Sequence, residues 1–93
     1  PSLDAELLAF LEEEGAVEVA GDVVFDAAAF REMVARVIEL LRQKESVTLA
    51  QVRDLLGTSR KYVQALLERM DDDRITVRRG DERVLRNPGA PTS

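Results

Sequence analysis

The sequence lacks the side chains that most often carry out chemistry in proteins. There is no cysteine and no histidine among its 93 residues. Without cysteine there are no disulfides, thiolate nucleophiles or thiolate metal ligands, and without histidine the usual acid–base group at neutral pH is missing. The pattern G-x-x-x-x-G-K-[ST] of phosphate-binding loops is also absent. We therefore expect a binding module with no catalytic residue, no metal ligand and no cofactor of its own.

Long apolar runs are missing as well. No stretch approaches the roughly 20 apolar residues that cross a bilayer, and the sequence does not open on a basic and apolar signal segment. Apolar residues make up 45% of the chain, which is enough for a small core, and charged residues make up 33%. We expect a cytoplasmic, monomeric module with no membrane partner.

The charge is distributed unevenly along the chain. The net charge is −5, but residues 1–45 hold eleven acidic and four basic residues, a net charge of −7. Residues 46–93 hold seven acidic and nine basic residues, a net charge of +2. The first part would repel a polyanion and the second would attract one.

The basic residues are densest in residues 74–86, which contain five arginines and two acidic residues. Alternating apolar residues flank Gly80-Asp81, a pattern typical of a β-hairpin with a two-residue turn. This register places Arg78 directly opposite Arg83, and like charges facing each other across a ladder are destabilising. We interpret the pair as a site for a backbone phosphate, and expect alanine at either position to leave the fold as stable or slightly more so. The alternative is a hairpin whose charges serve only solubility.

Apolar periodicity and capping residues predict the remaining elements. In chain order they are a helix over 3–14, a hairpin turning at Gly21-Asp22, a helix over 27–45 capped by Asp26, an extended break over 46–48, a helix from Thr48 to Gly57 with a capping box to Gln51, a helix from Thr58 or Ser59 to about Asp72, and the basic hairpin.

This order predicts a mainly α fold with small β-hairpins, arranged as a tandem winged helix whose first unit is truncated. Residues 26–87 would form the complete winged-helix domain, 1–25 the C-terminal half of a preceding unit, and 88–93 a disordered tail. The Gly-Asp turns of the two hairpins lie 59 residues apart, and we expect the strands around them to match with a one-residue shift. The first hairpin contains no lysine or arginine, so a basic wing is not a general feature of the repeat.

Four groups of residues resemble a known family. They are Gly57–Tyr62, Leu66–Glu68, Met70-Asp71 and Thr76–Arg86. Together they resemble the C-terminal winged-helix region of the bacterial selenocysteine-specific elongation factors, the SelB family, closely over 47–87 and in layout elsewhere. The resemblance implies an mRNA-binding module that holds the SECIS hairpin, which recodes UGA as selenocysteine. It also implies that the full-length protein is a GTPase and meets the ribosome, GTP and selenocysteyl-tRNA through upstream domains.

The resemblance and the charge pattern together predict the RNA-binding residues. These are Arg60, Lys61, Arg74, Arg78, Arg79, Gly80, Arg83 and Arg86. Arg60 and Lys61 lie in the first turn of the third helix, where free N–H groups and the helix dipole favour an anion. Arg74 departs from the family pattern, in which a glycine ends the helix. Tyr62 could stack on an extruded base, although packing between helices is the favoured interpretation. We interpret Asp71–Asp73 as a solvated helix end rather than a cation site.

Two other functions remain open at this stage. A DNA-binding winged-helix regulator would read the major groove with the exposed face of the third helix. That face, formed by Lys61, Gln64, Glu68 and Asp71, turns acidic after its first turn. A winged helix that binds another protein is the second alternative, and salt-dependent RNA binding would distinguish it from the RNA interpretation.

Overall fold

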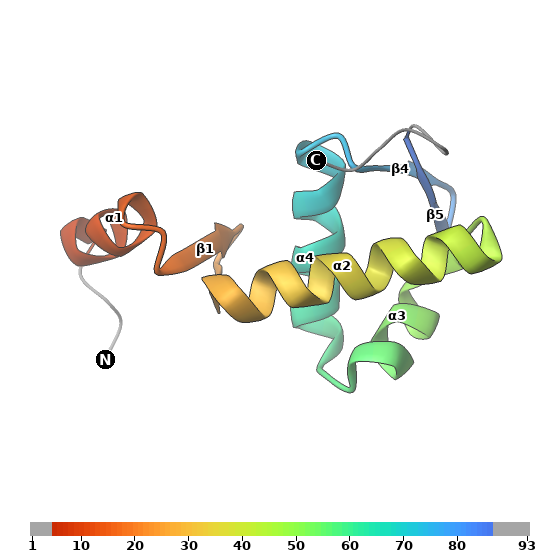
Figure 1. Ribbon diagram of the computed structural model, residues 1–93, viewed down its shortest axis with the longest axis horizontal. Helices are drawn as coiled ribbons and strands as arrows, with labels where there is room; N and C mark the ends of the chain where they lie inside the picture. The colour runs from red at the N-terminus through yellow and green to blue at the C-terminus, as the bar shows by residue number, and fades with distance from the viewer. Residues whose placement is uncertain (1–4, 87–93) are drawn as a thin grey trace.

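The computed structural model describes residues 5–86, and Figure 1 shows how their helices and strands are arranged. The elements are α1 (Ala5–Glu13), β1 (Val17–Ala20), β2 (Val23–Asp26), α2 (Ala27–Lys44), β3 (Val47–Thr48), α3 (Leu49–Leu56), α4 (Arg60–Asp72), β4 (Thr76–Arg79) and β5 (Glu82–Leu85). The predicted order of elements is confirmed. The predicted helix start at residue 3 and the predicted tail over 88–93 lie outside the described residues.

Helix α2 is the long central element that crosses α4 in Figure 1. It begins at Asp26, whose Oδ2 accepts a hydrogen bond from the N–H of Ala29 at 3.0 Å, because a carboxylate satisfies a free donor of the first turn. Phe30, Val37 and Leu41 recur at helical spacing and are buried. This predicted apolar face therefore forms one side of the core.

Helices α3 and α4 form the helix-turn-helix. The capping box is present: Thr48 Oγ1 accepts from the N–H of Gln51, whose side chain accepts from the N–H of Thr48. Gly57 ends α3 with φ of +64°, a left-handed conformation that glycine adopts without steric cost. Ser59 caps α4. The inward face of α4 is buried and consists of Val63, Leu66, Leu67 and Met70.

The wing is a three-stranded antiparallel sheet with the strand order β3-β5-β4. Arg78 lies opposite Arg83 in β4 and β5, as predicted. The short strand β3 adds to β5, with Thr48 opposite Glu82, and the hydroxyl of Ser46 donates to the Glu82 carboxylate at 2.8 Å. Because Thr48 also caps α3, this pairing places the N-terminus of α3 beside the wing.

The first three elements repeat the last three at a constant offset of 59 residues. Strand β1 corresponds to β4 and β2 to β5 at that offset, with the same cross-strand register. The predicted one-residue shift is therefore wrong, because the Gly-Asp turns and all strand positions coincide. The helix ends coincide too, since Gly15 and Arg74 both have positive φ. Residues 5–26 thus have the layout of residues 64–85.

The first hairpin packs on the body of the molecule. Ala20, Val23 and Phe25 belong to the same buried cluster as Phe30 of α2, and the rings of Phe25 and Phe30 have centroids 5.4 Å apart. Helix α1, by contrast, has no buried residue and projects away from the body in Figure 1. The predicted boundary between residues 25 and 26 stays a prediction; it falls inside β2, and the residues on its two sides share one buried cluster.

Candidate nucleic-acid interface

A basic cleft lies where the wing meets the helix-turn-helix. We call it the front cleft; it has a volume of about 310 Å³ and is lined by Thr48, Leu49, Ala50, Arg60, Arg78, Asp81 and Arg83. The strand pairing between β3 and β5 places the start of α3 at this cleft, and the turn from Gly57 to Ser59 places Arg60 there. The basic start of α4 therefore lies beside the wing through Arg60.

The front cleft is suited to an anion. Three guanidinium groups line it, against the single carboxylate of Asp81. The first residues of α3, Leu49 and Ala50, also line it, and the free N–H groups of a helix start carry partial positive charge. A phosphate in this cleft would meet guanidinium forks and backbone donors together, which is the arrangement that holds phosphates in proteins.

Arg60 and Arg78 are the exposed arginines of the front cleft. Arg78 Nε donates to the carbonyl of Gly80 at 3.0 Å, which directs the guanidinium along the hairpin turn. Within residues 5–86, neither arginine is in an ion pair. Gly80 has φ of +62°, so the tight turn depends on a residue that tolerates the left-handed region. Both guanidinium groups are thus available to a ligand.

Arg83 has a different environment from Arg78. The phosphate predicted between the two arginines is not needed to balance their charges. The side chain of Arg83 is only 6% exposed, and its Nη2 and Nε donate to Asp71 Oδ2 at 3.1 and 3.3 Å. The Asp71 carboxylate is therefore the anion that balances the facing arginines. Arg83→Ala is therefore no longer expected to leave the stability of the fold unchanged, because it would leave Asp71 without its cation.

The acidic run Asp71–Asp73 is not simply a solvated helix end. Asp71 Oδ1 accepts from the hydroxyl of Thr76 at 2.6 Å while Oδ2 binds Arg83, so this carboxylate ties both wing strands to the end of α4. Asp73 Oδ2 accepts from Arg69 Nε at 3.0 Å. Two of the three carboxylates hold the structure together, and the interpretation of the run as solvated is wrong for them.

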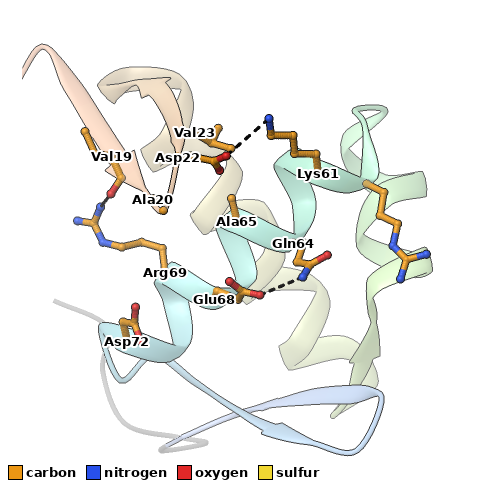
Figure 2. Close-up of a pocket in the computed structure, with 12 residues that line it drawn as sticks. Val19, Ala20, Asp22, Val23, Lys61, Gln64, Ala65, Glu68, Arg69 and Asp72 are labelled. Atoms are coloured by element: carbon orange, nitrogen blue, oxygen red, sulfur yellow. Dashed lines mark hydrogen bonds and ion pairs between the residues drawn. The ribbon is translucent and has the colours of Figure 1, made fainter. Parts of the chain in front are cut away.

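Lys61 and Tyr62 face the first hairpin. Figure 2 shows the cleft between β1–β2 and α4, of about 560 Å³, which we call the hairpin cleft. Lys61 Nζ lies 3.9 Å from Asp22 Oδ2 across it, in an exposed pair. The ring of Tyr62 packs edge-on against Phe25, with centroids 6.1 Å apart, and remains 47% exposed. The structure does not bring either residue into the lining of the front cleft.

Arg69 holds the two repeats together, and the sequence analysis missed it. Its Nη2 lies 2.7 Å from Glu18 Oε1. Its Nη1 donates to the carbonyl of Val19 at 2.9 Å, a contact that Figure 2 shows. Its Cζ lies 5.2 Å from the centroid of the Phe30 ring. Burial has the largest effect on the pKa of Arg69 and lowers it, but the hydrogen bonds and charges of Glu18 and Asp73 together outweigh burial and raise this pKa above its ordinary value. Its position four residues before Asp73 was the one signal available in the sequence.

The remaining predicted residues lie away from the front cleft. Arg79 and Arg86 line a second groove, of about 610 Å³, between the wing and the C-terminal end of α2. We call it the rear groove. Arg74 sits at the end of α4 with φ of +64°, at the position that Gly15 occupies in the first repeat. The eight predicted residues are therefore spread over two sides of the wing and the helix end.

The outer face of α4 is unsuited to a DNA major groove. Gln64 and Glu68 are joined by a hydrogen bond of 3.1 Å, and both line the hairpin cleft with Asp72 (Figure 2). The turn of the first hairpin stands opposite them. A duplex approaching this face would meet the hairpin and carboxylates, which disfavours the reading of bases by α4.

The two hairpins differ in charge at matched positions. The wing arginines at 74, 78, 79, 83 and 86 correspond, 59 residues earlier, to Gly15, Val19, Ala20, Val24 and Ala27. The backbone register is the same, so the arginines are a feature of the second hairpin alone rather than a requirement of the fold. Among residues 5–86, no cluster of three or more potential metal ligands is present, and no helix is long and apolar enough to span a membrane.

Comparisons with known proteins show the family to which this fold belongs. Residues 39–85 match the family described as "Elongation factor SelB, winged helix". The chain is 30% identical over 83 residues to a selenocysteine-specific elongation factor of Desulfomicrobium baculatum; the match covers 88% of this chain and 13% of that protein. The chain therefore spans about an eighth of the length of this relative.

Two solved structures resemble the fold. A bacterial selenocysteine-specific elongation factor, EF-Sec, superposes with a TM-score of 0.77 over 92% of this chain and 14% of its own, at 24% identity, which shows the fold alone. The mRNA-binding domain of elongation factor SelB from E. coli, in complex with SECIS RNA, superposes with a TM-score of 0.76 at 27% identity, over 86% of this chain and 67% of its own. The chain belongs to the SelB family of selenocysteine-specific elongation factors and is a winged-helix part of such a factor.

Proposed function

We propose that this chain is the mRNA-binding module of a selenocysteine-specific translation elongation factor and that its front cleft holds phosphates of the SECIS hairpin. The observation that carries the proposal is the convergence of Arg60 and Arg78, both exposed, on one cleft beside the start of α3. The E. coli relative, an mRNA-binding domain in complex with SECIS RNA, supports RNA as the ligand.

The residues of the front cleft have distinct roles in this proposal. Arg60 and Arg78 approach the RNA backbone from two elements, α4 and β4, and each guanidinium fork can bind a phosphate in a bidentate manner. Arg83 holds the wing against α4 through Asp71, and the Gly80 carbonyl directs the guanidinium of Arg78. We assign Lys61 to the hairpin cleft and Tyr62 to packing against the first hairpin, rather than to the RNA, because their contacts are with Asp22 and Phe25.

The wider role follows from the family. We propose that the full-length protein is a cytoplasmic GTPase that meets GTP, selenocysteyl-tRNA and the ribosome through other domains. The present chain would supply the contact with the mRNA and no catalytic group.

The experiment is a binding comparison between a SECIS hairpin and a duplex DNA of equal length, measured by fluorescence anisotropy on the full chain at one salt concentration. We expect the RNA hairpin to bind at least about tenfold more tightly. Arg60→Ala with Arg78→Ala should lower RNA affinity about tenfold or more, since the loss of even one charge-assisted contact costs about 1.5–3 kcal/mol.

The matched control for this experiment is Arg31→Ala with Arg53→Ala. Both are exposed arginines of α2 and α3 that line neither the front cleft nor the rear groove, so the pair removes the same charge. Equal binding of RNA and DNA, or an equal loss in the control, would contradict the proposal.

A further inference from the structure

The rear groove lies on the opposite side of the wing from the front cleft. Successive residues of a strand point to opposite faces of a sheet, and accordingly Arg78 lines the front cleft while Arg79 lines the rear groove. Arg86 joins Arg79 in the rear groove, and its N–H donates to the carbonyl of Ile75 at 3.0 Å. This bond fixes the position of Arg86 at the base of the hairpin.

The rear groove combines an apolar floor with a basic rim. Leu41 is buried beneath it, and Val84 and Leu85 of β5 are half-buried. Arg79 and Arg86 are exposed, and within the described part of the chain neither is in an ion pair. Arg42 also lines the groove, and Glu45 is the one carboxylate among its lining residues within 5–86. The groove therefore offers apolar surface and excess positive charge side by side.

In the first repeat, the residues that match the two arginines are buried. The positions that correspond to Arg79 and Arg86 are Ala20 and Ala27, which are 4% and 3% exposed. In the first repeat the same face is thus closed by small residues packed in the core. In the second repeat it is open and carries two arginines, although charge at these positions contributes nothing to packing.

We infer that the rear groove binds a single-stranded stretch of RNA that continues from the hairpin held in the front cleft. Arg79 and Arg86 would bind successive phosphates, and a base would lie on Val84 and Leu85. A duplex could not use the floor, because its base faces are stacked inside the helix, whereas unpaired nucleotides expose both base and phosphate. Adjacent residues Arg78 and Arg79 connect the two sites, so one RNA strand crossing the wing would meet both.

This inference rests on the proposed function, and the test separates the two. The full chain is titrated by fluorescence anisotropy with three RNAs: a blunt SECIS hairpin, the same hairpin with six unpaired uridines on its 5′ side, and the same hairpin with six on its 3′ side. We expect one of the two extensions to tighten binding about fivefold or more, because two further phosphates are held.

Arg79→Ala with Arg86→Ala should abolish the gain from the extension and leave the blunt hairpin unaffected. On the extended RNA, the slope of log affinity against log salt should become shallower by about 1.4 units, at roughly 0.7 per single-strand phosphate. The Arg31→Ala, Arg53→Ala control should keep the gain. Because all four arginines are exposed on the surface, these changes leave the core intact.

The outcomes distinguish the rear groove from the proposed function. A bound blunt hairpin with no gain from either extension, or a gain that survives Arg79→Ala with Arg86→Ala, overturns the rear groove as an RNA site while the proposed function stands. Failure to bind the blunt hairpin, with a short oligouridine still bound through Arg79 and Arg86, overturns the proposed function and keeps the rear groove. Failure to bind either RNA overturns both. Competition by polyglutamate for the extension alone would assign the groove to an acidic protein instead.

Discussion

At the scale of single residues, Arg78 and Arg83 show that two facing arginines can have different roles. They are cross-strand partners, yet Arg78 is exposed in the front cleft whereas Arg83 is buried against Asp71. Because Asp71 supplies the balancing charge from inside the protein, the wing needs no external anion to fold. The open guanidinium of Arg78 is then available for a ligand.

We predict that Arg83→Ala lowers the free energy of unfolding by about 2–4 kcal/mol, because it leaves the partly buried carboxylate of Asp71 without its cation. Arg78→Ala in the same strand pair should change it by about 0.5 kcal/mol or less, as exposed surface positions usually do. Urea denaturation of the full chain measures both. Equal effects of the two substitutions would contradict the division of roles.

The backbone conformation of Arg74 determines how substitution at this position changes the stability of the fold. Arg74 follows the last residues of α4 with φ of +64°, and its N–H donates to the carbonyl of Asp71 at 3.1 Å. A side chain with a Cβ is strained in this region. We predict that Arg74→Gly raises the free energy of unfolding by about 0.5–1 kcal/mol and that Gly15→Ala, at the matched position, lowers it by about 1 kcal/mol. Urea denaturation measures both changes, and a loss of stability in Arg74→Gly would show that the arginine side chain has a contact that outweighs the strain.

At the scale of elements, the position of the first hairpin depends on Arg69. This side chain reaches Glu18 and Val19 from α4 and also bonds to Asp73. The Lys61–Asp22 pair joins the same two elements but is longer, at 3.9 Å, and exposed. We therefore expect Arg69 to keep the first hairpin packed against α4 and Lys61 to contribute little, because exposed ion pairs are weak.

We predict that Arg69→Met lowers the protection of the amides of β1 and β2 against hydrogen exchange by about fivefold to tenfold, because the hairpin then opens more often. Protection in β4 and β5 should stay unchanged. Lys61→Met should alter neither hairpin, since exposed ion pairs contribute little. Similar protection of β1 and β2 in the two variants would contradict the assigned role of Arg69.

The elements themselves were predictable because their signals are local. The helix ends lie at Asp26, Thr48 and Gly57, and one hairpin turn lies at Gly80-Asp81. Each of these residues sets the structure through contacts with residues only a few positions away. The register that set Arg78 opposite Arg83 was equally local. These features required no knowledge of tertiary contacts.

The candidate site was predicted only in part, because its remaining features depend on distant contacts. Arg83 turns inward to meet Asp71, twelve residues earlier, and nothing in the hairpin sequence distinguishes it from Arg78. Lys61 faces the first hairpin because Phe25 packs with Phe30, a contact between the repeat and the body. By contrast, the separation of Arg79 from Arg78 follows from the sequence, because successive residues of a strand point to opposite faces.

At the scale of the whole molecule, charge is separated between the two ends of the chain. Residues 1–45 carry −7 and residues 46–93 carry +2, and both basic clefts are built around the wing of the second repeat. A polyanion would thus be attracted to one end and repelled from the other, which orients its approach. The acidic total charge is compatible with RNA binding because the arginines are gathered at the wing.

The salt dependence of hairpin affinity tests the central claim, that Arg60 and Arg78 hold RNA phosphates in the front cleft. Each neutralised phosphate steepens the slope of log affinity against log salt by about 0.7–0.9 units, so the two arginines of the front cleft together give a slope of roughly −1.4 to −1.8. Arg60→Ala and Arg78→Ala should each make the slope shallower by about one such unit, and Arg31→Ala should leave it unchanged. If both front-cleft variants keep the affinity and slope of the unaltered chain, the front cleft does not hold the RNA.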